Sequence, residues 1–171
     1  MMHRVRFMAV AAVVSSVVFI AACDDDDDPA GPPPVDQTNF SATLNGANER
    51  PNPVTTTAEG TAALTLFDTD SITFTIQVAS IDSVIMSHIH AGDATTAGPI
   101  LFGFEPNDPP QSFTTLTTLR SGTITPTSVG FQGSFTWDSL LTRLAAGTAY
   151  VNVHTRRNQG GEIRGQLAEV P

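Results

Sequence analysis

A strict alternation of apolar and polar residues across residues 71–80 constrains the fold of this chain more than any other feature. The apolar side chains take every second position: Ile72, Phe74, Ile76 and Val78. Successive side chains of a β-strand point to opposite faces, so this pattern predicts a strand with one buried face and one polar face. A second alternating stretch lies at residues 61–67, and the polar residues 68–70 between the two predict a hairpin turn.

Short apolar stretches bounded by Gly, Pro, Asn and Asp continue along the chain. Further strands are expected at residues 40–45, 84–90, 100–104, 116–124, 130–136, 149–154 and 162–167. The regular alternation of strands and helices along the chain that is typical of a parallel sheet does not occur. The sequence therefore predicts an all-β fold, an antiparallel Greek-key-like sandwich or barrel.

One short helix is expected to interrupt the strands. Asp138 is its predicted N-cap, and Gly147 is predicted to end it. Between them the apolar face of the helix comprises Leu140, Leu141 and Leu144.

Acidic residues outnumber basic ones in the 171-residue chain. There are 17 Asp and Glu residues against 8 basic residues, all of them arginine, and the formal net charge is −9. Binding of nucleic acid requires clustered Lys or Arg, so no nucleic-acid partner is expected. Cys23 is the single cysteine, and the folded part must therefore depend on its hydrophobic core rather than on a disulfide.

The first 22 residues are typical of a secretory signal peptide. Arg4 and Arg6 supply a positive start, and an almost unbroken apolar stretch leads to Cys23. Ending on this cysteine, residues 1–22 resemble a bacterial lipoprotein signal, which implies that Cys23 is lipidated. Residues 23–38, with a run of five aspartates followed by several prolines, are expected to form an extended tether. The chain is therefore predicted to be lipid-anchored to a membrane of the bacterial cell envelope, on its extracytoplasmic (periplasmic or surface) side.

Three histidines occur beyond residue 38, all within expected strands. His88 and His90 share one face of a strand, and His154 lies in another strand. Neutral imidazole binds copper or zinc, so these histidines are candidate metal ligands, with Asp93 as a candidate fourth. The alternative is structural, because imidazoles can also bond backbone carbonyls or carboxylates and fix the loop at residues 91–99. The residues alone leave both interpretations open, but three histidines are too few for a dinuclear site of the superoxide dismutase type.

Three further polar residues accompany His154 in the C-terminal part of the chain. Asn152 lies on the same strand face as His154 and is expected to orient that imidazole. Glu162 and Arg164 also share a face. They either recognise a ligand or form exposed ion pairs along the sheet, which contribute only about 0–1 kcal/mol each.

No motif in the sequence indicates a catalytic site. The Gly-x-Ser-x-Gly turn of serine hydrolases does not occur. Ser87 precedes His88 but faces the other side of the strand, so the two cannot form a catalytic pair. Glu49 and Glu59 are too isolated to indicate an acid–base pair, and no enzyme class follows from the sequence.

Three segments, in order, resemble the CHRD domain, the repeated module named after the secreted protein chordin. They begin with LNGANERP at residue 44, HIHAG at residue 88 and GTAYVNVHT at residue 147, and the last ends in GEIRGQL at residue 167. The resemblance implies an extracytoplasmic all-β domain at residues 39–171, superoxide-dismutase-like or immunoglobulin-like in type. In chordin the module belongs to a protein that binds growth factors, but for bacterial members the resemblance implies no established activity or ligand.

We accordingly expect a binding or structural module with a protein or envelope component as its partner. The alternative is a copper- or zinc-binding domain that uses His88, His90 and His154, with or without redox activity.

Overall fold

The structure is a computed structural model that describes residues 35–171, so the expected signal peptide, Cys23 and most of the tether lie outside the described residues. The strands are β1 (Gln37–Asn45), β2 (Glu59–Phe67), β3 (Ser71–Ala79), β4 (Ile81–Ala91), β5 (Ile100–Gly103), β6 (Gln111–Phe113), β7 (Thr117–Ile124), β8 (Ala149–Thr155), β9 (Ile163–Gln166) and β10 (Ala168–Val170). Helix α1 spans Trp137–Ala145, and a 3-10 turn, η1, spans Gly46–Asn48.

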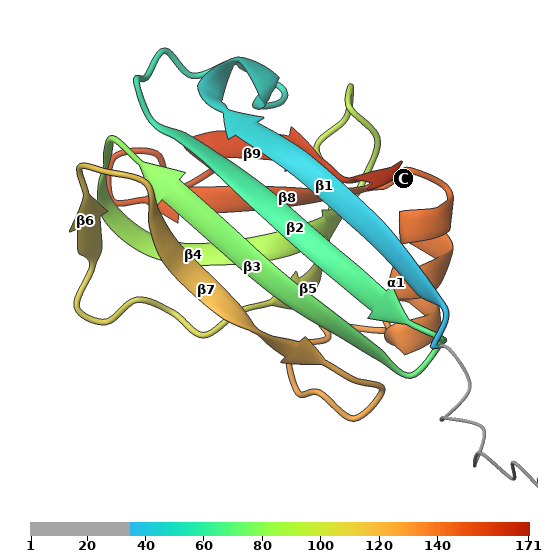
Figure 1. Ribbon diagram of the computed structural model, residues 1–171. Coiled ribbons are helices and arrows are strands. Elements are labelled where there is room, and N and C mark those ends of the chain that lie inside the picture. Colours follow the sequence, from blue (N-terminus) through green and yellow to red (C-terminus); the bar gives the residue numbers. More distant parts are fainter. Residues whose placement is uncertain (1–34) are drawn as a thin grey trace, which may run out of the picture. The chain divides into compact units, whose positions relative to one another are not determined.

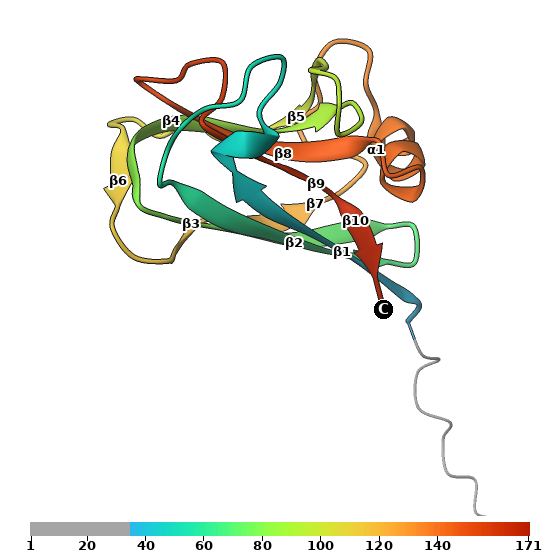
Figure 2. The same ribbon diagram turned by 90° about the horizontal axis from the view of Figure 1, so that it is seen from above.

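The paired strands are antiparallel, and the expected all-β sandwich with one short helix is confirmed. The sheet has the order β5-β4-β8-β9-β1-β2-β3-β7. Figure 2 shows this single sheet curled into two layers, with β4, β5 and β8 in one and β1, β2, β3 and β7 in the other. Strand β1 connects the layers, because it pairs with β2 along its length and with β9 where Asn45 lies opposite Arg164.

The hydrophobic core lies between the two layers. The alternation at residues 71–80 is confirmed, since Ile72, Ile76 and Val78 of β3 are completely buried in this core. From the other layer, β4 and β8 contribute odd-numbered residues such as Ile89 and Val151. The register of β4 shifts between Val84 and Met86, and side chains alternate along a strand, so the even-numbered residues of β4 after this shift and those of β8 point to the outer face of that layer. This parity places every candidate histidine outside the core.

One of the expected strands is absent. Residues 130–136 form only an isolated bridge, between Phe131 and Phe102. Gly133 has a φ of +60°, which is incompatible with an extended strand and marks a turn instead. Two three-residue strands, β6 and β10, were not expected, because segments this short carry no measurable alternation.

The predicted helix exists, but its N-cap is wrong. Thr136, not Asp138, is the N-cap, and its hydroxyl accepts a hydrogen bond from the backbone N–H of Ser139 at 3.4 Å. Asp138 instead lies in the first turn, where a carboxylate interacts favourably with the positive end of the helix dipole. The predicted stop at Gly147 is confirmed, since this residue has a φ of +63° directly after the C-cap.

Helix α1 lies at one end of the sandwich (Figures 1 and 2). The indole N–H of Trp137 donates to the carbonyl of Thr69 in the β2–β3 turn at 2.9 Å. Leu140 and Leu144 are buried against the core, as the predicted apolar face requires. Within residues 35–171 the structure contains no helix with the length and apolarity needed to cross a membrane.

Replacing Leu140 by Ala should lower the free energy of unfolding by about 2–5 kcal/mol, because a completely buried leucine leaves a cavity when it is truncated. Leu116→Ala is the control, since its side chain is 57% exposed, and should change stability by less than about 0.5 kcal/mol. Denaturant unfolding of both variants measures the difference. Equal losses in the two variants would contradict the placement of the helix.

Candidate metal centre

Strand β8 is buried on both of its faces. It lies between β4 and β9, and all seven of its residues are buried. Ala149, Val151 and Val153 belong to the core, while Tyr150, Asn152 and His154 face outward and are covered by three connecting segments. These are the segment around η1, the β4–β5 loop and the β8–β9 loop, which lie over this layer in Figure 2. We call the covered outer surface the polar layer; its members are Glu49, His88, His90, Tyr150, Asn152, His154 and Arg164.

The three candidate histidines meet in this layer. His88, His90 and His154 are 7%, 9% and 6% exposed, and one ring nitrogen from each lies within 4.8 Å of the other two. His88 Nδ1 and His154 Nε2 are only 3.0 Å apart. The expected shared face of His88 and His90 is confirmed, and β8 brings His154 to the same place because it pairs with β4. We refer to these three residues as the histidine cluster.

Backbone carbonyls determine which nitrogen carries the proton in two of these rings. His90 Nδ1 lies 2.9 Å from the carbonyl oxygen of Gly98, and His154 Nδ1 lies 2.9 Å from that of Gln159. A carbonyl only accepts, so each Nδ1 must donate and each Nε2 must keep its lone pair. His90 Nε2 is buried and has no hydrogen-bond partner. These contacts also fix the two covering loops, as the structural interpretation of the histidines predicts.

All three imidazoles are held in the neutral form. Burial, together with the smaller effect of the neighbouring His154, lowers the pKa of His88 to about 3 and that of His90 to about 4, although the hydrogen bond with the Gly98 carbonyl raises the pKa of His90. Burial also lowers the pKa of His154. A metal binds the neutral ring, so the cluster is ready for a metal at neutral pH without the loss of a proton to solvent.

Tyr150 and Arg164 support the cluster from the side. The Tyr150 ring stacks on His90, with ring centres 4.9 Å apart and an interplanar angle of 12°. The guanidinium carbon of Arg164 lies 3.5 Å from the centre of the Tyr150 ring, which is a close cation–π contact. Arg164 also donates to the carbonyls of Asp93 and Thr96 and so fixes the β4–β5 loop. Arg164 is only 2% exposed, so it does not form the exposed ion pair that was one of the two expectations for this residue.

Glu49, like Tyr150, is a member of the polar layer that the sequence did not identify. Both of its carboxylate oxygens accept hydrogen bonds from the Asn152 amide at 3.0 Å, so Asn152 orients Glu49 rather than His154. Burial raises the pKa of Glu49 to about 7, although the hydrogen bond from Asn152 and the charge of Arg164 oppose this change. Gly161 lies directly on this pair, since a Cβ at that position would be 2.6 Å from the Asn152 amide.

Asp93 and Glu162 lie outside the histidine cluster. The Asp93 carboxylate accepts hydrogen bonds from Thr95 and Thr96, which lower its pKa to about 2, and its side chain is exposed. Glu162 is buried, and its carboxylate accepts hydrogen bonds from Thr56, Thr155 and Asn158. Burial raises the pKa of Glu162, but these hydrogen bonds outweigh burial and lower it overall. Both carboxylates are therefore occupied by hydrogen bonds that stabilise loop segments.

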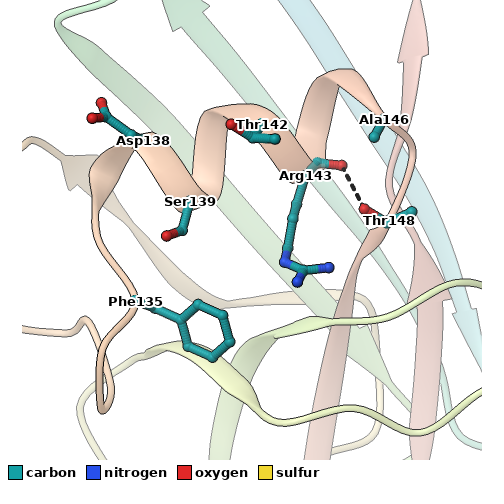
Figure 3. A pocket seen from close by; sticks show the side chains of 7 residues that line it. All are labelled: Phe135, Asp138, Ser139, Thr142, Arg143, Ala146 and Thr148. Atoms are coloured by element: carbon teal, nitrogen blue, oxygen red, sulfur yellow. Dashed lines mark hydrogen bonds between the residues drawn. The ribbon is translucent and has the colours of Figure 1, made fainter.

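The hollow along helix α1 is a separate feature (Figure 3). It has a volume of about 460 Å³, and the Arg143 side chain extends from the helix towards Phe135, with its guanidinium carbon 5.8 Å from the ring centre. The hydroxyl of Thr148 donates to the Arg143 carbonyl at 3.5 Å. The histidine cluster does not line this hollow, so the hollow is not part of the candidate metal centre.

Glu49→Gln should raise the stability of the domain relative to the native protein at pH 8, but not at pH 4.5. The carboxyl has a raised pKa, so its contribution to folding is fully present below the ordinary value of 4.5 and is lost as the pH rises through about 7. One pKa unit corresponds to about 1.4 kcal/mol, and screening by solvent reduces the total, so we expect a gain of about 1 kcal/mol. Unfolding free energies measured between pH 4.5 and 8 test this.

Glu59→Gln is the matched control, because Glu59 is exposed on β2. Its pH profile should run parallel to that of the native protein. If the Glu49→Gln profile is parallel as well, the burial of Glu49 has no electrostatic cost.

The folded part of the chain matches a known protein family. The family model of the CHRD domain matches residues 40–167, a span that contains the whole polar layer. No curated protein matches the chain. Because the family match covers well over half of the sequence, the protein belongs to the CHRD domain family.

Proposed function

We propose that this CHRD domain binds one copper or zinc ion through His88, His90 and His154. The observation that carries the proposal is the convergence of three buried, neutral imidazoles, among which His90 Nε2 has no other partner. A buried polar atom normally finds a hydrogen bond, so an unpaired nitrogen on a ring that lies beside two other imidazoles calls for an explanation. A bound ion supplies one.

The structural role of the histidines supports this proposal and does not compete with it. The carbonyls of Gly98 and Gln159 occupy only the Nδ1 atoms of His90 and His154. Metal-binding histidines usually donate their second ring N–H in this way, since the bond fixes the ring and raises its basicity. The same contacts that hold the loops therefore prepare the Nε2 atoms for a metal.

The distances are compatible with a metal after a small closure of the site. Metal–nitrogen bonds of about 2.0–2.1 Å separate the nitrogens of a trigonal site by about 3.5 Å. His88 Nδ1 and His154 Nε2 now lie 3.0 Å apart, and one ring nitrogen from each histidine lies within 4.8 Å of the other two, so rings must shift by about 1 Å. His88 binds through Nδ1 once its proton is on Nε2, which is a change of tautomer and not a loss of charge.

Three imidazoles make the preferred ligand set. For Asp93 to become a fourth ligand, its carboxylate would have to leave Thr95 and Thr96. Three protein ligands leave a position for an external ligand, as in catalytic zinc sites, but no reaction is assigned to this domain. The expected role as a binding or structural module stays a prediction, because no contact with a partner is present to test it.

Elemental analysis and titration of the purified domain with copper and zinc should give one ion per chain. His90→Ala and His154→Ala should each weaken binding by more than about 100-fold, because each removes a ligand and changes outside the ligand set already cost about 10–100-fold. If the native domain takes up neither ion, the proposal is wrong.

Ser87→Ala is the control for these variants. Ser87 adjoins His88, but it pairs with Val153 on the core side of the layer, and its hydroxyl has no hydrogen-bond partner. The variant should fold and bind one ion with unchanged affinity.

We also propose that Cys23 carries a lipid that attaches the domain to a membrane of the bacterial cell envelope, on the extracytoplasmic side. The support is the sequence of residues 1–23, which lies outside the described residues. Cys23→Ser should move the protein from the membrane fraction to the soluble fraction in cell fractionation, whereas Ser41→Ala, an exposed change on β1, should not. Membrane association that survives Cys23→Ser would refute lipidation.

A further inference from the structure

We infer that the histidine cluster is a site for the monovalent ion Cu(I) in preference to Zn(II). This inference rests on the proposed function, since it names the ion that the same three histidines hold. It follows from the charges in and around the polar layer.

The ligand set carries no charge of its own. Within residues 35–171, the one group of three or more His, Cys, Asp or Glu side chains close enough to share an ion consists of His88, His90 and His154. Neutral imidazoles donate electron pairs but do not offset the charge of the ion. A divalent ion held by these three ligands keeps a net charge of +2, whereas Cu(I) keeps +1.

The surrounding charges already balance without an ion. Three guanidinium groups and three carboxylates interact around the layer: Arg50, Arg157 and Arg164, and Glu49, Asp93 and Glu162. Burial raises the pKa of Glu49 to about 7, so this carboxyl is protonated in part of the molecules at neutral pH. The layer therefore holds no surplus of negative charge for an arriving cation.

Burial makes the difference between the two ions large. The cost of moving an ion from water to a medium of low polarity rises with the square of its charge, so it is about four times greater for Zn(II) than for Cu(I). The three histidines are at most 9% exposed, and solvent can lower this cost only to a small extent.

Arg164 adds to the discrimination because its charge is permanent and buried. Its guanidinium carbon lies 3.5 Å from the Tyr150 ring centre, which lies 4.9 Å from that of His90, so the cation is on the order of 10 Å from the ion. At this distance and an effective dielectric constant of about 20, repulsion weakens binding roughly tenfold for each unit of charge on the ion. The repulsion acts on two units of charge in Zn(II) and on one unit in Cu(I).

The number of ligands points the same way. Cu(II) favours a square-planar or tetragonal set and Zn(II) a tetrahedral one, and both need at least four ligands. Cu(I) has a filled d shell and accepts three ligands in a plane. Three histidines thus complete the ligand set of Cu(I) from protein atoms alone, whereas Zn(II) needs a further ligand such as water.

The test is a competition titration of the metal-free protein at pH 7.5. Cu(I) is added without oxygen against a chromogenic Cu(I) chelator, and Zn(II) is added against a zinc chelator. We expect Cu(I) to bind with one equivalent and more than 100-fold more tightly than Zn(II). A smaller preference, or tighter binding of Zn(II), overturns this inference but leaves the proposed metal site intact. If neither ion binds, the proposed function itself is wrong.

Variants of Arg164 test the electrostatic cause. Arg164→Gln removes the cation and should raise the affinity for Zn(II) about tenfold more than the affinity for Cu(I). Arg164→Lys keeps the charge and should leave the ratio of the two affinities unchanged. Arg156→Gln removes an exposed arginine from the β8–β9 loop and should also leave it unchanged. Equal effects of Arg164→Gln on both ions would contradict the role of this charge. If this variant does not fold, the competition between the two ions in the native protein still tests the preference for Cu(I).

Discussion

The burial of β8 on both faces is the constraint on which the rest of this structure depends. A strand with one apolar face and one polar face normally leaves the polar face in water. Here connecting segments cover that face, so every polar group on it needs a partner within the protein. The carbonyls of Gly98 and Gln159, the carboxylate of Glu49 and the contact between His88 and His154 meet part of this need, and His90 Nε2 remains without a partner.

The polar layer lowers the stability of a metal-free domain at acidic pH, whereas a metal-binding domain can use its neutral imidazoles. Burial disfavours protonation of the histidines, and their lowered pKa values cost stability as the pH falls below the ordinary value of 6.5. An apolar layer of similar volume would avoid that cost. A bound ion offsets it, because binding only to the folded state adds stability in proportion to the logarithm of ion concentration over the dissociation constant.

Most of the fold and part of the candidate site could be predicted because they depend on the alternation of side chains between the two faces of a strand. Alternation at residues 71–80 identified β3, and the spacing of His88 and His90 placed both rings on one face. Glu49 could not be predicted, since it follows η1 and approaches Asn152 across 103 positions of the chain. The N-cap could not be predicted either, because both Thr136 and Asp138 have side chains able to cap a helix.

The sequence by itself determined the strands, the antiparallel class of the fold and the pairing of His88 with His90 on one face, because these follow from the local geometry of the backbone. Only the tertiary structure decided that His154 joins them, since that depends on β8 pairing with β4 rather than with another strand. It also decided that Arg164 is a buried cation beside Tyr150 and not a surface charge. Burial and charge balance arise from contacts between distant segments, and these properties govern which ion such a site prefers.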